Sequence, residues 1–355
     1  MVAIFKRSRV ILCVSGLFIY FVMRGVKQLF SYHKVNSVES NNKCQHLYNI
    51  AKDMLNGVRI KLPFETKQTK WKFHREVDLG LLERTSLRWN YPTNEISNKT
   101  KRFMDIYKNA KSRNIKSKKY FITFADNCCH RSKIKAVMCA LYPGGFHNIT
   151  VYDLNSLSNG FKKTHSYILS QKRGRGYWLW KPYILLKTLV ENTEDGDLVM
   201  YQDAGAHIIR DAGPLLKLCQ DSKYGILMFY LTLLEHHYTK RDAFVLMDMD
   251  DRQVRKTLQR LASFLVIRRN CMSLQFLMEW LAYASDARIL TDMENKMGKK
   301  NFPEFKEHRH DQSVLSLLSK KWGLEAFRTP SQFGNPIGYR GGPYEQIILH
   351  SRARN

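Results

Sequence analysis

Apolar runs of strand length alternate with helical patterns from Lys118 onward. The first run, Tyr120 to Ala125, is rich in aromatic and β-branched residues, which favour a strand. Pro182 suits the first turn of a helix, because its missing N–H leaves no bond unmade there. Such alternation is typical of an α/β domain with a mostly parallel sheet and helices on both faces. The predicted elements are strands at 120–125, 149–152 and 198–201, and helices at 134–141, 161–170 and 183–191.

The rest of the chain continues this pattern with longer apolar segments. Residues 225–234 form an apolar run, and residues 274–284 have the spacing of an amphipathic helix. We predict a strand at 263–267 and further helices at 252–261, 274–284 and 314–321.

The amino terminus carries an uncharged run, Val10 to Met23, between basic flanks. Fourteen residues are short for a membrane span, which takes about 20, but no small-residue cleavage site precedes the charged flank. Flanking arginines can snorkel, and thin membranes tolerate short spans. We interpret the run as a type II signal anchor with the bulk of the chain in the lumen. A cleaved signal peptide or a buried helix is the alternative.

Positive charge is concentrated at the same end of the chain. The net charge is +27, and residues 1–118 hold 24 Lys and Arg against 8 Asp and Glu. This balance fits a stem near anionic head groups or acidic glycans. A nucleic-acid footprint is the other interpretation, but no zinc-finger spacing, basic-region heptad or RNP-like strand accompanies the charge, so we do not expect nucleic acid as a partner.

Sequons and cysteines agree with a lumenal location. Asn98 and Asn148 each begin an N-x-T triplet, although such triplets also arise by chance. Six of the seven cysteines lie outside the apolar run, and their even number permits disulfides. Their spacing does not indicate which of them pair, and it gives no support for a zinc site.

The segment from Gly174 to Gly205 combines an aromatic-basic turn, a helix and a strand that ends near a carboxylate. Lys181 lies at the positive end of the predicted helix, which favours a phosphate or carboxylate. Trp178 and Trp180 offer flat faces to a base or a sugar ring. Asp203 follows the strand, where ligands of open α/β sheets bind. The alternative is that Asp203 only starts a turn and both tryptophans are core.

Two further clusters carry carboxylates. Asp248, Asp250 and Asp251 form a D-x-D pattern that could ligate Mn²⁺ or Mg²⁺. We favour the interpretation that these acids start a helix. The second cluster, residues 307–313, contains His308, His310, Asp311 and Gln312. Capping of a helix by Asp311 would explain one carboxylate, but not the neighbouring His and Gln side chains. We therefore interpret it as the acceptor side of a transferase site.

The order of four motifs resembles glycosyltransferase-like proteins of the nucleotide-diphospho-sugar transferase (GT-A) superfamily. The motifs are Gly176-Tyr-Trp-Leu-Trp-Lys-Pro182, Asp197-Leu-Val-Met-Tyr-Gln-Asp-Ala-Gly205, Thr239-Lys-Arg-Asp-Ala-Phe244 and His308-Arg-His-Asp-Gln-Ser313. The resemblance covers roughly residues 118–335. It implies one GT-A-like domain, often held in the Golgi by a type II anchor, that uses a nucleotide sugar and usually a divalent cation.

This resemblance assigns Asp203 to the first acid of the superfamily's D-x-D, but position 205 is Gly where the second acid is expected. Metal dependence is therefore in doubt, or rests on Asp250 and His310. We expect transfer of a sugar to a hydroxyl of a glycan or glycoconjugate, with Mn²⁺ or Mg²⁺ as the cation. The alternatives are an inactive, membrane-tethered glycan-binding protein and a glycan phosphotransferase.

The expected roles follow from these motifs. The expected organisation is a cytosolic tail (1–9), an anchor (10–24), a basic stem (25–117), a catalytic domain (118–340) and a tail (341–355) in the Golgi or endoplasmic reticulum membrane. Catalytic roles fall to Asp203, His310 and Asp311, donor binding to Asp126, Arg175, Trp178, Trp180, Lys181 and Asp203, acceptor binding to Lys240, Asp242, His308 and Gln312, and metal ligation to Asp203, Asp250 and His310.

Overall fold

The computed structural model describes residues 44–60, 117–126, 130–334 and 346–351. The chain divides into two units, Met1–Asn49 and Ile50–Asn355. Residues 44–55 are helical, and everything described below belongs to the second unit. The predicted anchor at 10–24 and the sequon at Asn98 lie outside the described residues. None of the described helices has the length and apolar character that a bilayer-crossing segment needs.

A central mixed sheet has seven described strands in the order β2-β1-β3-β7-β5-β6, with β8 pairing to β5. Strands β1, β2 and β3 are parallel, β7 runs against β3 and β5, and β6 runs against β5. Five of the seven strands therefore point the same way, which confirms the predicted, mostly parallel sheet. The strands are β1 (Lys119–Phe124), β2 (Asn148–Tyr152), β3 (Leu198–Gln202), β5 (Ile226–Leu234), β6 (Leu258–Arg260), β7 (Phe264–Arg268) and β8 (Ala326–Arg328), and a separate pair is β4 (Ala206–Ile208) with β9 (Ile348–His350).

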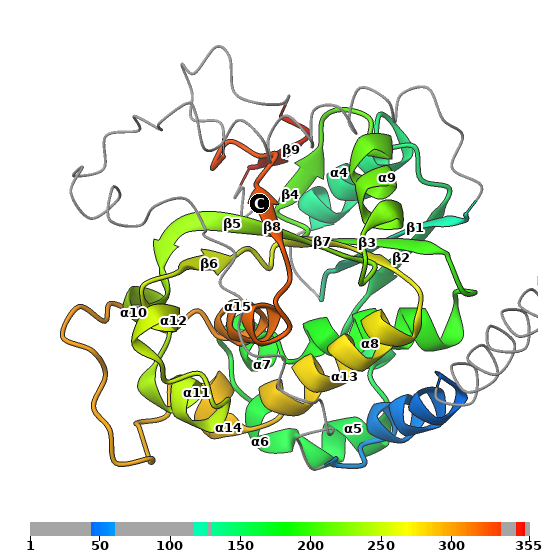
Figure 1. The fold of residues 1–355 in the computed structure, drawn as a ribbon. Helices are drawn as coiled ribbons and strands as arrows, with labels where there is room; N and C mark the ends of the chain where they lie inside the picture. The colour runs from blue at the N-terminus through cyan, green and yellow to red at the C-terminus, as the bar shows by residue number, and fades with distance from the viewer. Residues whose placement is uncertain (1–43, 61–116, 127–129, 335–345, 352–355) are drawn as a thin grey trace, which may run out of the picture. The chain divides into compact units, whose positions relative to one another are not determined.

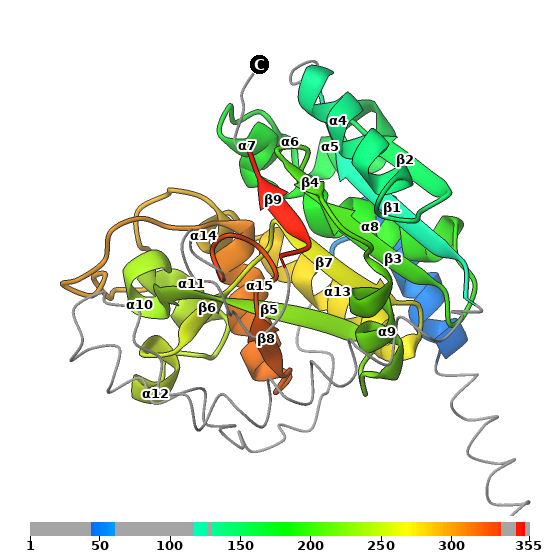
Figure 2. The same ribbon diagram turned by 90° about the horizontal axis from the view of Figure 1, so that it is seen from above.

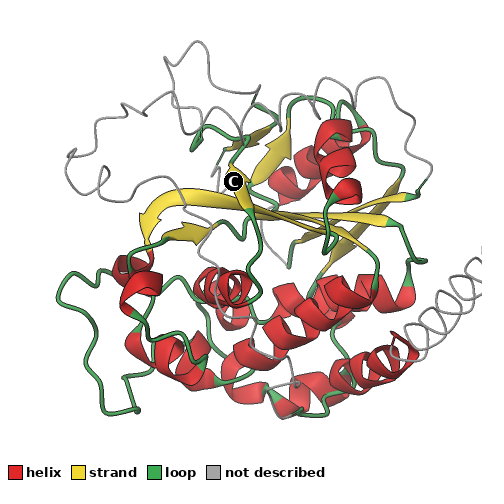
Figure 3. Cartoon of the chain, in the orientation of Figure 1, coloured by secondary structure: helices red, strands yellow, loops and turns green. Residues whose placement is uncertain are grey.

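Helices cover both faces of the sheet (Figure 1, Figure 3). On one face lie α4 and α9, and on the other lie α8, α13 and α15. The described helices are α4 (His130–Leu141), η1 (Leu154–Ser156), α5 (Asn159–Thr164), α6 (Ser166–Leu169), α7 (Gly174–Tyr177), α8 (Trp180–Glu191), α9 (Gly213–Asp221), α10 (Glu235–Tyr238), α11 (Arg241–Leu246), α12 (Arg252–Arg255), α13 (Cys271–Ala284), α14 (Ala287–Leu290) and α15 (Asp311–Lys321).

Strand β3 shows why both faces must be covered. Leu198 and Met200 join an apolar cluster with Leu215 and Leu216 of α9. The alternate side chain Tyr201 points to the opposite face and is also fully buried. A strand that is apolar on both faces is stable only between two helical layers.

One predicted helix needs correction, and its predicted start is confirmed. The helix predicted at 252–261 is only α12, and residues 258–260 form β6 instead, because Leu258 and Arg260 pair with β5. The predicted helix start at the acidic cluster is confirmed for Asp251, whose side chain accepts a hydrogen bond from the Gln253 N–H.

The domain also extends beyond residue 340. Residues 348–350 were assigned to a terminal tail, but they form β9, which pairs with β4 (Figure 2). This pairing carries His350 to the candidate site described next.

Candidate functional site

A cavity of about 580 Å³ lies where β3 ends and where α15 begins. It brings together side chains from three of the motifs singled out in the sequence. Its lining includes Arg173, Trp178, Lys181, Asp203, Ser263, Glu307, His308, Arg309, His310, Asp311, Gln312, Gln332, Phe333 and His350. A separate cavity of about 450 Å³, between residues 54–60 and the helices α5, α6, α13 and α14, contains none of the predicted site residues.

Lys181 is the centre of the charge arrangement. Its side chain is almost fully buried, and Nζ lies 2.7 Å from Asp311 Oδ2 and 3.3 Å from Asp203 Oδ1. Nζ also donates a hydrogen bond to the Ala262 carbonyl at 3.2 Å. Burial alone would lower the pKa of Lys181, but the two carboxylates together raise it, so the ammonium stays charged. One lysine thus holds two acids that are far apart in the sequence.

Asp311 is a buried acid with an unusual proton affinity. Burial raises the pKa of its carboxyl to about 6, although the Lys181 ammonium opposes the shift. Capping of α15 was one candidate role for Asp311, and the structure does not give it that role. The N-cap is His310, no side chain caps the helix, and Asp311 is its first residue. The carboxylate is therefore directed to Lys181 and the cavity.

Asp203 is more accessible than Asp311, with a side chain 36% exposed. The hydroxyl of Tyr201 donates a short hydrogen bond to Asp203 Oδ1. Burial and the neighbouring Asp203 charge hold the pKa of Tyr201 well above its usual value, so the phenol keeps its proton. No motif marked Tyr201 as functional, and only its position two residues before Asp203 on a buried strand could have pointed to it.

The two histidines of the cluster, His308 and His310, differ in how many of their ring nitrogens form hydrogen bonds. His308 Nε2 contacts the Ile289 carbonyl at 2.8 Å and Nδ1 accepts the Lys240 N–H at 3.2 Å, so both ring nitrogens hold backbone. His310 contacts the Leu290 carbonyl through Nδ1 at 2.9 Å. Its Nε2 is buried without a hydrogen bond, 3.8 Å from Asp292 Oδ1. Burial lowers the pKa of both rings, so His310 is a neutral imidazole beside the cavity.

Trp178 is presented by a left-handed turn. All five residues from Gly174 to Trp178 have positive φ, including 54° at Arg175, 51° at Tyr177 and 60° at Trp178. Each non-glycine residue in this region costs about 1–2 kcal/mol, so the turn persists only because its surroundings hold it. The Trp180 indole donates to the Gly174 carbonyl at 2.9 Å, and the Trp178 ring stacks near His310 at 5.6 Å between centroids.

A smaller cavity of about 160 Å³ adjoins Trp178 on another side. Its lining includes Asp126 and Arg175, which form an ion pair at 3.1 Å between Asp126 Oδ2 and Arg175 Nε. Trp180 also lines it, but its ring is stacked on Phe124 at 3.7 Å and is mostly core. All six predicted donor residues therefore line one or both of these cavities, and Trp178 lines both.

Three predicted residues do not line either cavity, namely Lys240, Asp242 and Asp250. Lys240 Nζ donates to the carbonyls of Thr291 and Met293. Asp242 accepts the N–H groups of Lys296 and Met297 at 2.6 and 3.1 Å. These two side chains therefore fix the loop at 291–297 and do not face an acceptor.

The predicted metal ligands are not assembled. Asp250 pairs with Arg241 at 3.0 Å and Lys299 at 2.7 Å, outside both cavities. Asp203 Oδ1 already contacts the Lys181 ammonium and the Tyr201 hydroxyl. Within the described parts of the chain, no group of three His, Cys, Asp or Glu side chains could hold a metal ion. Among the described residues, the side chains predicted as ligands therefore do not fit a divalent cation, because Asp250 lies outside the cavities and Asp203 Oδ1 already contacts a buried lysine.

Several lining residues were missed by the sequence. Arg173 pairs with Asp292 at 3.0 Å and Glu307 at 3.8 Å. His350 lies 3.5 Å from the Ser263 hydroxyl, and its backbone exchanges hydrogen bonds with Gln332. No local motif marks His350, because it reaches the cavity only through the pairing of β9 with β4.

No protein-family model matches the chain, and no curated protein matches it. Similar solved structures include the bifunctional glycosyltransferase WbbM, with 11% identity and a TM-score of 0.40 over 68% of this chain and 47% of that chain. Galactosyltransferase LgtC, solved with donor and acceptor sugar analogs, has 14% identity and a TM-score of 0.36 over 65% and 86%. Mouse xyloside xylosyltransferase 1 has 9% identity and a TM-score of 0.40 over 65% and 97%.

These three structures are all of glycosyltransferases. The chain spans about half the length of the first of them. Because every TM-score is 0.40 or lower, we take the chemistry of the site from its own side chains.

Proposed function

We propose that the chain is a glycosyltransferase that moves a sugar from a nucleotide-diphosphate donor to a hydroxyl of a glycan or glycoconjugate. The observation that carries this proposal is the buried carboxyl of Asp311, with a pKa of about 6, in one cavity with Lys181, Asp203 and Trp178. A group of this kind is ionised near neutral pH, yet basic enough to take a proton from a hydroxyl.

The donor is proposed to span the two cavities at Trp178. The smaller cavity, with Asp126, Arg175 and the edge of Trp180, suits a planar base, because aromatic walls and a charged pair give both stacking and hydrogen bonding. The diphosphate would then lie in the larger cavity near Arg173 and the first turn of α8.

In the proposed reaction, the acceptor oxygen bonds to the anomeric carbon while the bond from that carbon to the diphosphate oxygen breaks. The Asp311 carboxylate takes the acceptor proton, and the nucleoside diphosphate leaves. Lys181 holds Asp311 in place, and together with Arg173 it offsets the negative charge that grows on the leaving group. No step is assigned to a metal ion. Gln312 and His310, which line the same cavity, would bind sugar hydroxyls at the acceptor side.

The proposed location is the lumen of the Golgi or endoplasmic reticulum, with the chain held by a type II anchor at residues 10–24. Cys271 is disulfide-bonded, which suits an oxidising compartment, whereas Cys139 and Cys219 are free thiols. The sequon residue Asn148 is exposed at the start of β2, where a glycan could be attached.

A panel of nucleotide sugars tests this proposal. The full chain in detergent is incubated with each donor and simple glycoside acceptors, with and without Mn²⁺, and products are weighed by mass spectrometry. We expect one donor to release nucleoside diphosphate and to extend an acceptor by one sugar, and Asp203→Ala to lose this activity. Glycan binding without turnover that survives in Asp203→Ala would instead support a glycan-binding protein. Transfer of phosphate would support the phosphotransferase.

A further inference from the structure

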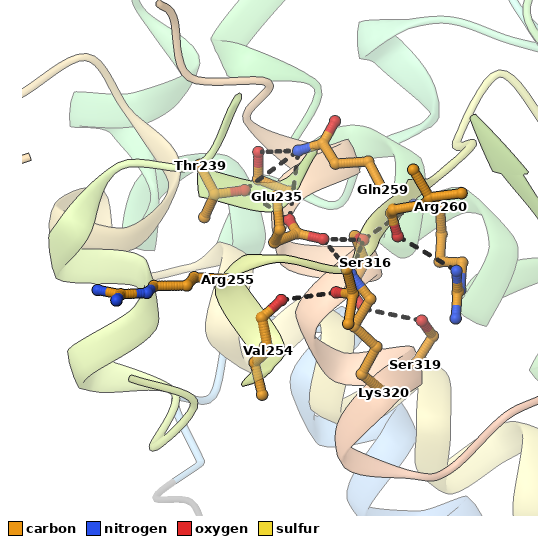
Figure 4. A network of polar contacts seen from close by, with 12 residues as sticks. Glu235, Thr239, Val254, Arg255, Gln259, Arg260, Ser316, Ser319 and Lys320 are labelled. Atoms are coloured by element: carbon orange, nitrogen blue, oxygen red, sulfur yellow. Dashed lines mark hydrogen bonds and ion pairs between the residues drawn. The ribbon is translucent and has the colours of Figure 1, made fainter. Parts of the chain in front are cut away.

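Beneath the cavity lies a buried polar network that the proposed reaction does not use (Figure 4). At its centre is Glu235, the first residue of α10, which is fully buried. Oε1 accepts hydrogen bonds from the Thr239 hydroxyl at 2.6 Å and the Gln259 amide at 3.3 Å. Oε2 accepts the Ser316 hydroxyl at 2.6 Å and pairs with the Lys320 ammonium. Glu235 therefore ties α10 to β6 and α15.

The Glu235 charge determines which way the Gln259 amide faces. A carboxylate only accepts hydrogen bonds, so it must meet the NH₂ group of Gln259. The Tyr238 carbonyl, 3.1 Å from the same nitrogen, is also only an acceptor, so it too must face the NH₂ group. Gln259 is fully buried, and Figure 4 shows its amide nitrogen directed to this side and its oxygen directed away. The orientation of the amide is thus fixed by two groups that cannot donate.

The orientation of the Gln259 amide determines the orientation of Gln312, which lines the cavity. The Gln259 oxygen accepts a hydrogen bond from the Gln312 side-chain nitrogen at 2.8 Å. This bond directs the Gln312 NH₂ group toward Gln259 and its Oε1 to the opposite side, where Oε1 accepts the Ala262 N–H at 3.5 Å and keeps a second lone pair. Gln312 lines the cavity. It therefore presents a hydrogen-bond acceptor, which suits a substrate hydroxyl or N–H.

We propose that Gln259 is a positioning residue for the substrate site. Glu235, paired with Lys320, fixes the direction of the Gln259 amide. As a result, Gln312 offers its side-chain carbonyl oxygen to a hydroxyl or N–H of the substrate. The assignment of that substrate as a sugar rests on the proposed function. The positioning itself rests only on the hydrogen bonds.

A structural comparison tests the positioning without any substrate. Crystal structures of the full chain are compared for the wild type, Gln259→Met and the control Gln275→Met. Gln275 is also a buried glutamine bonded to a glutamate, Glu279, but it lies on α13 away from the cavity. We expect the Gln312 side chain to change position in Gln259→Met and to stay in place in Gln275→Met. An unmoved Gln312 in Gln259→Met would overturn the proposal.

Kinetics test the consequence for the substrate found in the nucleotide-sugar panel. We expect Gln259→Met and Gln312→Met each to raise KM about tenfold, the value of roughly one hydrogen bond, with kcat little changed. The double variant should be no worse than either single variant, because Gln259 acts through Gln312. Effects that multiply in the double variant, or an equal rise of KM in Gln275→Met, would contradict the proposal.

Two provisions keep the tests separate. If Gln259→Met does not fold, Glu235→Gln is used instead, because it keeps the shape of the network and removes the charge. We expect Glu235→Gln to raise KM as well. An unchanged KM in Glu235→Gln would contradict the role of Glu235. If the wild type turns over no donor, the proposed function fails, and the crystal comparison still decides the positioning.

Discussion

The Lys181 ammonium lies 2.7 Å from Asp311 Oδ2, and both groups are buried at the first turns of two different helices, α8 and α15. The same ammonium reaches Asp203 at the end of β3. This arrangement keeps two acids together at the edge of the sheet, and it gives one of them, Asp311, a pKa that suits proton transfer near neutral pH.

Replacing Asp311 tests its role as the base. Asp311→Asn keeps the shape of the side chain but cannot take a proton, so we expect kcat to fall by about 10²–10⁴-fold with little change in donor affinity. Steady-state kinetics and donor binding are the measurements. Asp221→Asn, at an exposed aspartate paired with Lys217, is the control and should keep wild-type rates. Full activity of Asp311→Asn would remove Asp311 from the mechanism.

Removing the Lys181 ammonium between the two acids should lower the free energy of unfolding and raise the pKa of Asp311. Lys181→Met leaves Asp203 and Asp311 without their shared partner, so we expect the free energy of unfolding to fall by roughly 3–5 kcal/mol. The pKa of Asp311 should rise further, because the cation that opposes the effect of burial is gone. Denaturant unfolding measures the first effect. Lys217→Met, at a surface ion pair with Asp221, should cost only about 0.3–0.5 kcal/mol. Equal losses in the two variants would contradict the buried pair.

The left-handed turn at Gly174 can be tested with a matched glycine. Gly174 has φ of +59°, and an added Cβ would lie 2.4 Å from the Trp178 ring. Gly196 has φ of +91°, and an added Cβ would meet nothing within 4 Å. Both alanine variants pay the backbone cost of about 1–2 kcal/mol, but only Gly174→Ala must displace Trp178. We expect nucleotide affinity to drop in Gly174→Ala alone, as measured by calorimetry. Equal affinity in the two variants would place the nucleotide away from Trp178.

Local patterns predicted the elements that carry the site. Pro182 and the apolar run after Asp197 were sufficient to place α8 and β3, so Lys181 and Asp203 could be assigned to one ligand site. The helix expected at 252–261 failed because Val254, Leu258 and Leu261 have helical spacing, while pairing of Leu258 and Arg260 with β5 decides the structure.

Long-range contacts explain what the sequence could not predict. Aspartate is a common helix-capping residue, so the sequence alone suggests capping for Asp311, and only the fold shows that its carboxylate contacts Lys181. Lys240 and Asp242 carry charges suited to ligand binding, yet both bind backbone of the loop at 291–297. His350 depends on the pairing of β9 with β4, which no local pattern encodes.

The dependence of kcat/KM on pH tests the central claim most directly. Asp311 must be ionised to accept a proton, and its pKa in the folded protein is raised to about 6. Activity of the full chain on its donor should therefore be low at pH 5, rise through an apparent pKa of about 6 and level off above it. In Lys181→Met this rise should move to higher pH. A rate that is flat or falls from pH 5 to 7.5 would contradict a transferase that uses Asp311 as its base.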